Sequence, residues 1–286
     1  MTAITRLGAG RTVRQDGDVQ KPGLVASDVD GTLLDAMERV SERTARVVRR
    51  VITAGTPFIL VSGRPPRWIP NVAQAAGVSG YAVCANGAIL YDIAADEIVS
   101  AHTLDPVLMN DVAHALEAAM PGITLASERP AQARFPDRAY LTEETYSNPW
   151  GDAENNTGTR AEVLGRPASK LLVRHKEMTS EEMALVAETI LDDAVTVTFS
   201  ASGGLLELSV QGVTKATGLA EAAERLSLDA SGVVAFGDMP NDIEMLKWAG
   251  HGVAMANAHE DVLAVADEIT APNVEDGVAQ VLERWF

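Results

Sequence analysis

The sequence predicts an α/β protein with a doubly wound, mainly parallel, Rossmann-like core sheet and an inserted α+β cap domain. Short, continuously apolar runs recur at residues 24–27, 58–61, 81–84, 233–236 and 252–255. Runs of this kind are typical of strands that are buried on both faces. Helix-like segments lie between these runs, and the alternation of strand and helix favours a parallel sheet.

The helix-like segments have recognisable ends. Ser41 is a suitable N-cap for a helix that Gly55 ends, and a second helix is expected over residues 67–76. Residues 215–226 carry apolar side chains at helical spacing, and Pro240 suits the first turn of another helix. These segments supply the connections that a doubly wound sheet requires.

The middle of the chain has a different pattern. A helix is expected to begin at Asp105 and Pro106, and strand-like runs follow a stretch, residues 127–168, that is rich in proline, glycine and charge. We therefore expect a flexible leader at residues 1–22, a core domain made of residues 23–103 and 206–286, and an inserted α+β domain at residues 104–205.

Composition and charge exclude several classes of function. With 286 residues, 47% of them hydrophobic, the chain is long and apolar enough for a full core. A net charge of −17 disfavours nucleic acid and anionic membranes as partners, and no apolar run is long enough to span a membrane. The single cysteine, Cys84, excludes an intramolecular disulfide, and residues 1–22 do not resemble a secretory signal. We expect a cytoplasmic protein.

The sharpest motif is Asp28-Val29-Asp30-Gly31-Thr32, which follows the first apolar run. Two carboxylates two residues apart point the same way in extended chain, and their mutual repulsion favours a cation between them. The glycine comes too early for a calcium-binding loop. Taken alone, the motif is also compatible with a solvated acidic turn.

A second acidic motif follows another apolar run. Asp238, Asn241 and Asp242 end the strand-like segment 233–236. Ligands of open α/β sheets bind at the carboxyl ends of the strands, so these groups are expected beside Asp28. Such an oxygen-rich set suits Mg²⁺ rather than zinc, although an acid at a helix start is also favourable without a metal.

Two further segments offer contacts for phosphate. Ser62 and Gly63 end the second apolar run, where a hydroxyl and backbone N–H groups can hold phosphate oxygens and Arg64 adds charge. Lys215 stands at the start of a predicted helix, where its charge opposes the helix dipole. Each signal alone is weak, because a turn or a solvated lysine is the commoner case.

Together, these four segments resemble the four motifs of haloacid dehalogenase-like phosphatases, in particular the Cof-type subgroup with its cap between the second and third motifs. Asn86-Gly87-Ala88 also resembles a segment of this subgroup. Met239 and Pro240 inside the fourth motif depart from the usual small or polar residues.

The resemblance implies a Mg²⁺-dependent phosphatase that acts on a small phosphorylated metabolite through an aspartyl-phosphate. The roles it implies are a nucleophile (Asp28), a general acid and base (Asp30), phosphate ligands (Ser62, Gly63, Lys215 and Asn241) and metal ligands (Asp28, the backbone carbonyl of Asp30, Asp238 and Asp242, directly or through water). Two alternatives stay open: a phosphomutase or phosphotransferase of the same superfamily, and a non-catalytic sensor of a phosphorylated ligand.

The cap is expected to supply most contacts to the leaving group. It carries five basic candidates, each of which is more simply explained as a solvated surface residue: Arg129, Arg134, Arg138, Lys170 and His175. No cap residue is therefore assigned to the site from the sequence.

Overall fold

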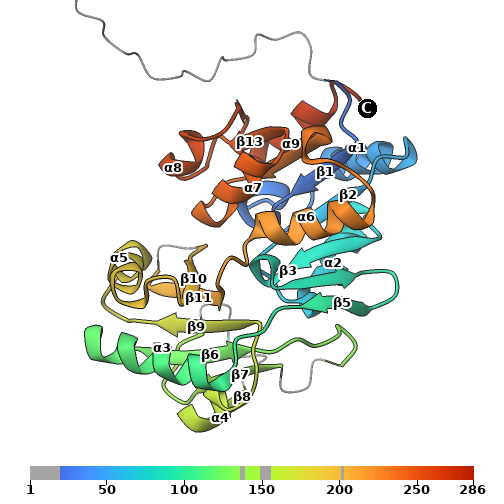
Figure 1. Ribbon diagram of the computed structural model, residues 1–286. Coiled ribbons are helices and arrows are strands. Elements are labelled where there is room, and N and C mark those ends of the chain that lie inside the picture. Colours follow the sequence, from blue (N-terminus) through green and yellow to red (C-terminus); the bar gives the residue numbers. More distant parts are fainter. Residues whose placement is uncertain (1–19, 136–138, 149–155, 201–202) are drawn as a thin grey trace, which may run out of the picture.

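The computed structural model describes residues 20–135, 139–148, 156–200 and 203–286 and contains two β-sheets. In Figure 1 the first sheet and its helices form the upper body, and the second sheet with its helices lies below it. Most of the expected leader at residues 1–22 lies outside the described residues.

The first sheet has eight strands in the order β14-β13-β12-β1-β2-β3-β4-β5, and the pairs from β14 to β3 are all parallel. Its strands are β1 (Leu24–Ser27), β2 (Phe58–Val61), β3 (Tyr81–Cys84), β4 (Ile89–Asp92), β5 (Glu97–Ala101), β12 (Val233–Gly237), β13 (His251–Met255) and β14 (Glu268–Thr270). The antiparallel strands β4 and β5 extend one edge. The expected mainly parallel, doubly wound sheet is confirmed.

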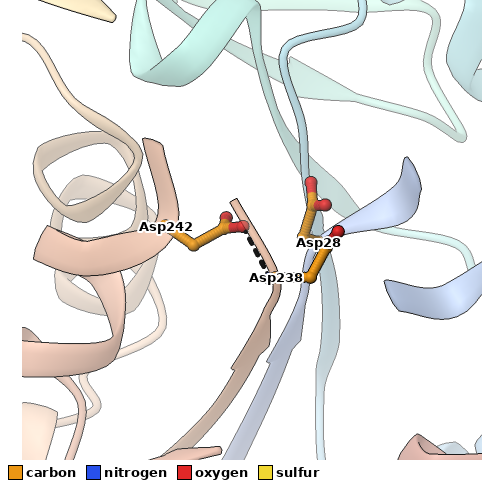
Figure 2. A group of neighbouring side chains, drawn as sticks. All are labelled: Asp28, Asp238 and Asp242. Atoms are coloured by element: carbon orange, nitrogen blue, oxygen red, sulfur yellow. Dashed lines mark hydrogen bonds between the residues drawn. The ribbon is translucent and has the colours of Figure 1, made fainter. Parts of the chain in front are cut away.

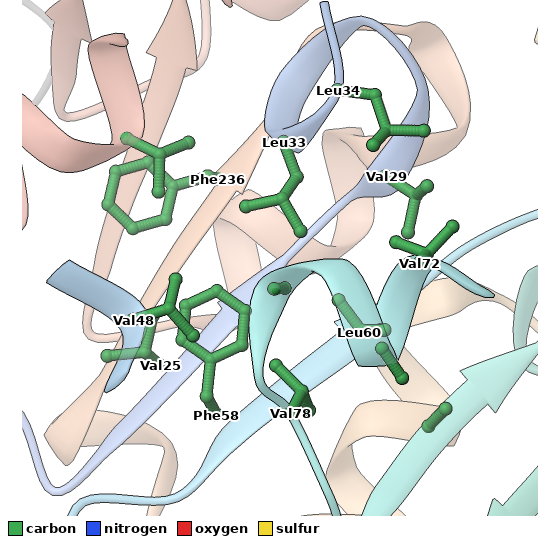
Figure 3. Packing of buried hydrophobic residues seen from close by; sticks show 14 of the residues in the cluster. Val25, Val29, Leu33, Leu34, Val48, Phe58, Leu60, Val72, Val78 and Phe236 are labelled. Atoms are coloured by element: carbon green, nitrogen blue, oxygen red, sulfur yellow. The ribbon is translucent and has the colours of Figure 1, made fainter. Parts of the chain in front are cut away.

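Helices cover both faces of this sheet. They are α1 (Glu42–Thr53), α2 (Ile69–Ala76), α6 (Lys215–Arg225), α7 (Ile243–Trp248), α8 (Glu260–Leu263) and α9 (Gly277–Leu282). Alternate residues of each strand point to opposite faces, so Val25 packs with α1, α2 and α9, whereas Leu24 packs with α6, α7 and α8. Figure 3 shows Val25, Phe58 and Phe236 in the first of these two apolar layers.

The five apolar runs of the sequence are β1, β2, β3, β12 and β13, and Ser41 caps α1 by accepting a hydrogen bond from the Thr44 N–H. The hairpin β4–β5 was not anticipated. Its outer strand has no fully buried residue, so the sequence there lacks the apolar run that marks the central strands. Edge strands carry this weaker signal because one side of the ladder faces solvent.

The second sheet has six strands in the order β10-β11-β9-β6-β7-β8. It comprises β6 (Thr124–Glu128), β7 (Tyr140–Glu143), β8 (Asn156–Gly158), β9 (Lys170–Arg174), β10 (Val195–Thr198) and β11 (Leu205–Val210), with helices α3 (Pro106–Ala119), α4 (Arg160–Leu164) and α5 (Ser180–Leu191). The expected boundary between residues 205 and 206 falls within β11, which pairs with β9 and β10 as far as Val210. We propose that residues 104–210 form the cap.

The two faces of the second sheet differ in chemistry. Leu171 and Val173 of β9 point into an apolar cluster with α3 and α5. The alternate residues Lys170, Leu172 and Arg174 line a cavity that also contains the end of β1. The cap therefore presents a mixed polar and apolar face to the core.

No helix in the described part of the chain has the length and apolar character that a membrane crossing requires.

The packing of α6 against β3 gives a test of the fold. A helical Gly-to-Ala change is normally favourable by about 1 kcal/mol, but a Cβ on Gly218 would lie 2.6 Å from Val83 Cγ1 and 2.8 Å from Gly87 Cα. We expect Gly218→Ala to destabilise the protein by roughly 1–3 kcal/mol, measured by urea unfolding. Gly232→Ala is the control, because its Cβ would meet nothing closer than the Gly23 nitrogen at 4.0 Å. Equal stability of the two variants would contradict this packing.

Candidate active site

Three neighbouring strands bring the acidic motifs to one edge of the first sheet. β1 lies between β12 and β2, with Ser27 in register with Phe236 and Leu60. The residues that follow these strands therefore meet at their carboxyl ends, and Asp28 and Asp238 stand side by side there (Figure 2). This is the edge at which ligands of open α/β sheets bind.

The turn after β1 depends on a glycine. Gly31 has a φ of +76°, and a Cβ there would come within 2.2 Å of Asp238 Oδ2. The next residue, Thr32, donates from Oγ1 to Asp238 Oδ1 at 2.7 Å. Residues Asp28–Thr32 therefore turn closely around the Asp238 carboxylate.

Lys215 lies at the centre of the cluster. Its Nζ donates to Asp28 Oδ1 and to Asp242 Oδ1, both at 2.7 Å, and the side chain is 1% exposed. The second oxygen of Asp242 accepts from the N–H groups of Asp238 and Met239, each at 3.0 Å, and Figure 2 marks the first of these bonds. The helix dipole that opposes Lys215 is thus outweighed by two buried carboxylates. The expected contact of Lys215 with phosphoryl oxygens stays a prediction.

Burial and mutual repulsion perturb these carboxyl groups. Burial, together with Asp242, raises the pKa of Asp238 to about 6. Burial also raises the pKa of Asp28 well above its ordinary value, although Lys215 opposes this shift. Despite its own burial, Lys215 has a raised pKa because Asp242 and Asp28 stabilise its charge. The Lys215 ammonium group therefore stays protonated, whereas its single positive charge does not balance the negative charge of the three carboxylates.

A divalent cation fits this arrangement. Asp28, Asp238 and Asp242 each offer an oxygen within 4.8 Å of the other two. When ionised, three carboxylates and one ammonium leave two negative charges, which one divalent ion would balance. The donors are all oxygens, as Mg²⁺ prefers. Because Lys215 and two N–H groups already occupy the oxygens of Asp242, Asp28 and Asp238 are the better candidates for direct ligation.

The predicted phosphate ligands all lie close to the cluster, but they differ in whether they line the cavity. Asn241 and Gly63 line the cavity with Asp28, whereas Ser62 is fully buried below it, and its Oγ accepts from the Arg64 N–H at 3.1 Å. Asn241 donates to Asn86 Oδ1 at 3.2 Å, and its own buried Oδ1 has no hydrogen-bond partner. The second motif therefore exposes the backbone at Gly63 to a ligand, whereas the Ser62 hydroxyl stabilises the loop through its hydrogen bond with the Arg64 N–H.

Asp30 is held by an arginine from the neighbouring strand end. Arg64 donates to both carboxylate oxygens of Asp30, from Nε at 2.8 Å and from Nη2 at 2.5 Å. The Asp30 side chain is 55% exposed, and it lines the same cavity as Asp28. A carboxyl group that borders both Asp28 and solvent is suitably placed for proton transfer.

The cavity between the core and the second sheet has a volume of about 800 Å³. It contains a set of residues that the sequence did not assign to the site: Arg67, Trp68, Glu128, Tyr140, Arg174 and Glu207. The one available signal was the alternation of polar and apolar residues along β9, which indicates a sheet face that is not packed against helices.

One of the five basic cap candidates reaches this cavity. Lys170 is buried rather than solvated, donates to the Gly63 carbonyl at 2.8 Å and pairs with Glu207. Arg129 donates to the Glu162 carbonyl, Arg134 pairs with Asp96, and His175 contacts the Pro121 carbonyl, all away from the cavity lining. Arg138 lies outside the described residues.

The chain belongs to the haloacid dehalogenase-like hydrolases. The model of this family matches residues 25–282, which includes all four motifs and the inserted segment. The expected Cof-type phosphatase is confirmed at this level, and the protein is a phosphatase of this family.

Two proteins of Bacillus subtilis (strain 168) are similar along nearly their whole length. The 5-amino-6-(5-phospho-D-ribitylamino)uracil phosphatase YitU is 30% identical in an alignment of 276 residues that covers 93% of this chain and 98% of the relative. A second protein with the same enzyme name, YcsE, is 29% identical in an alignment of 274 residues that covers 95% of this chain and 98% of the relative.

Solved structures agree with the fold. A haloacid dehalogenase-like hydrolase from Bacteroides thetaiotaomicron superposes with a TM-score of 0.73 at 27% identity, covering 92% of this chain and 99% of that one.

The role of Lys215 in the cluster can be measured through stability. Lys215→Met leaves two buried carboxylates without their cation, so we expect a loss of about 3–5 kcal/mol of unfolding free energy in EDTA. Lys247→Met is the control, because its partner Glu244 is exposed and such surface pairs contribute at most about 1 kcal/mol. Similar losses of unfolding free energy in both variants would show that the buried contacts of Lys215 stabilise the protein no more than a surface ion pair does.

The raised pKa of Asp238 predicts how metal affinity depends on pH. Below about pH 6 its carboxyl group is protonated in the metal-free protein, and a cation must displace that proton to bind. We expect Mg²⁺ affinity, measured by calorimetry, to fall by up to about tenfold per pH unit below this point for this one proton, and more steeply where the Asp28 carboxyl group is protonated as well. Constant affinity between pH 5 and 7.5 would rule out Asp238 as a ligand.

Proposed function

We propose that the protein is a Mg²⁺-dependent phosphatase that hydrolyses a small phosphorylated metabolite through a covalent phosphoryl group on Asp28. The observation that carries this proposal is the position of Asp28, which lines the 800 Å³ cavity and is hydrogen-bonded to the buried Lys215. An ionised carboxylate at the floor of a cavity suits in-line attack on a phosphate ester.

In the first step, a carboxylate oxygen of Asp28 forms a bond to phosphorus as the bond to the leaving oxygen breaks. Asp30, protonated for this step, gives its proton to that oxygen and releases the alcohol. Arg64 supports this assignment because it holds the Asp30 carboxyl group at the edge of the same cavity.

In the second step, water attacks the phosphorus of the aspartyl-phosphate. Asp30, now a carboxylate, accepts the proton of the water, and Asp28 is regenerated as phosphate leaves. The N–H groups around Gly63 and the side chain of Asn241, which line the cavity, are the proposed phosphate ligands together with Lys215. Fixed donors of this kind stabilise the charge of the transferring group.

A bound Mg²⁺ would neutralise the charge between the carboxylates and the phosphoryl group. We propose that Asp28, Asp238 and the backbone carbonyl of Asp30 hold it, with Asp242 contributing through water. The spacing of the three carboxylates supports this set.

The leaving group is proposed to be a polyol or sugar with a further polar group, and 5-amino-6-(5-phospho-D-ribitylamino)uracil is the first compound to test. The names of the two Bacillus subtilis relatives support this choice. The cavity supports it too, because 800 Å³ is room for a ligand larger than a simple sugar phosphate. As part of the same proposal the enzyme acts in the cytoplasm, and neither nucleic acid nor membrane is its substrate.

The direct test is release of phosphate from a panel of phosphorylated sugars, polyols and nucleotides, with Mg²⁺ and with EDTA. We expect Asp28→Asn to abolish turnover, because the amide cannot act as the nucleophile, and EDTA to abolish it in the wild type. Asp229→Asn, an exposed change on the core, is the control and should retain full activity.

Other results would redirect the proposal. Isomerisation of a sugar phosphate without free phosphate would identify a phosphomutase. Mg²⁺-dependent binding without turnover of any compound would favour a sensor. Release of phosphate by Asp28→Asn at the wild-type rate would contradict the covalent mechanism.

A further inference from the structure

Among the residues that the structure describes, five cationic side chains line the cavity, and four of them are paired with carboxylates. The pairs are Arg64 with Asp30, Arg67 with Glu128, Lys170 with Glu207, and Lys215 with Asp28 and Asp242. The fifth is Arg174, which has neither an ion pair nor a hydrogen bond to any described residue. This difference singles out Arg174.

Arg174 is the last residue of β9, on the face that points toward the core. Its Nη1 is buried and has no hydrogen-bond partner. The hydroxyl of Tyr140, another residue of the cavity wall, approaches that of Tyr146, and neither hydroxyl has a hydrogen bond to any other described residue. Of these buried groups, the charged guanidinium of Arg174 is the donor that most needs an acceptor.

Such an arrangement is unfavourable unless a ligand completes it. A buried donor without a partner costs free energy, and a charged donor costs more than a neutral one. Native proteins therefore pair nearly all such groups, and an exception needs an explanation. Burial raises the pKa of Tyr146 to about 12, so its hydroxyl stays a donor, and the charge of Arg174 acts against this rise. The side chains match a ligand that offers oxygen acceptors.

The position of Arg174 sets the distance of that group from the phosphate. Lys170, on the same strand and face, contacts the Gly63 carbonyl beside the proposed phosphate site. Arg174 is four residues further along, which is ~13 Å in an extended strand. A short phosphate ester bound at Asp28 does not span this distance, whereas an extended polyol carrying a second group does.

We propose that Arg174 forms a second recognition subsite for oxygen acceptors at the far end of the leaving group. Carbonyl oxygens of a ring or a carboxylate both have this chemistry. A polyol without such a group ends in a neutral hydroxyl, which is a donor as well as an acceptor. It therefore forms a weaker hydrogen bond with the guanidinium than a carboxylate does. The inference rests on the proposed phosphatase function and names the class of substrate that the cavity prefers.

The test compares two pairs of substrates that differ only at the distal end. One pair is 5-amino-6-(5-phospho-D-ribitylamino)uracil and D-ribitol 5-phosphate, and the other is 6-phosphogluconate and D-glucitol 6-phosphate. In Arg174→Met, which keeps a long apolar side chain, we expect kcat/KM to fall roughly tenfold to hundredfold for the acceptor-bearing member of at least one pair. The values for both polyol phosphates should stay within about threefold of wild type. The first pair reports on carbonyl oxygens and the second on a carboxylate.

Two further readouts separate recognition from structure. Arg166→Met, an exposed change on the cap away from the cavity, should leave all four values unchanged. Because the Arg174 side chain has no partner among the described residues, Arg174→Met should not lower the Tm. A uniform fall for all four substrates, or no change for any, would overturn the subsite. A wild-type enzyme that hydrolyses none of the four would instead contradict the proposed function, and the subsite would fall with it.

Discussion

The contact on which the site depends is the buried ammonium of Lys215 between Asp28 and Asp242. Both Nζ–oxygen distances are 2.7 Å, and none of the three side chains is appreciably exposed. Without this cation, the carboxylates at the ends of β1 and β12 would repel one another in a region of low dielectric constant. The ammonium allows two acidic motifs, about 210 residues apart in the sequence, to share one sheet edge. It leaves the cluster with a charge that a divalent cation would balance.

This local arrangement reconciles an acidic protein with an anionic substrate. The chain carries a net charge of −17, yet five cationic side chains line the cavity. Four of them are neutralised by partners, which fixes their geometry without producing a strongly positive surface. The exception is Arg174. It lies at the end of β9 opposite Lys170, away from the proposed phosphate site. In the proposed mechanism the cluster at Asp28 binds the phosphoryl group, and the cap selects the leaving group.

Much of the core was predictable because its signals are local. Strands buried on both faces require continuous apolar runs, and Asp28 and Asp238 directly follow two of them. The cap face was not predictable, because the roles of Lys170 and Arg174 depend on how two distant sheets approach each other. Lys170 and Glu207 are remote in sequence and meet only through the pairing of β9, β11 and their neighbours. The predicted boundary between residues 205 and 206 falls inside β11 for the same reason: the strands with which a segment pairs are set by tertiary structure.

The central claim is that phosphoryl transfer passes through Asp28. The most direct measurement is a single turnover with excess enzyme, quenched in acid at early times, followed by mass spectrometry of the peptide that contains Asp28. A covalent mechanism predicts a transient peptide heavier by one phosphoryl group, which decays as phosphate appears and is absent from Asp28→Asn. Release of phosphate at the full rate with no labelled peptide at any time would contradict it.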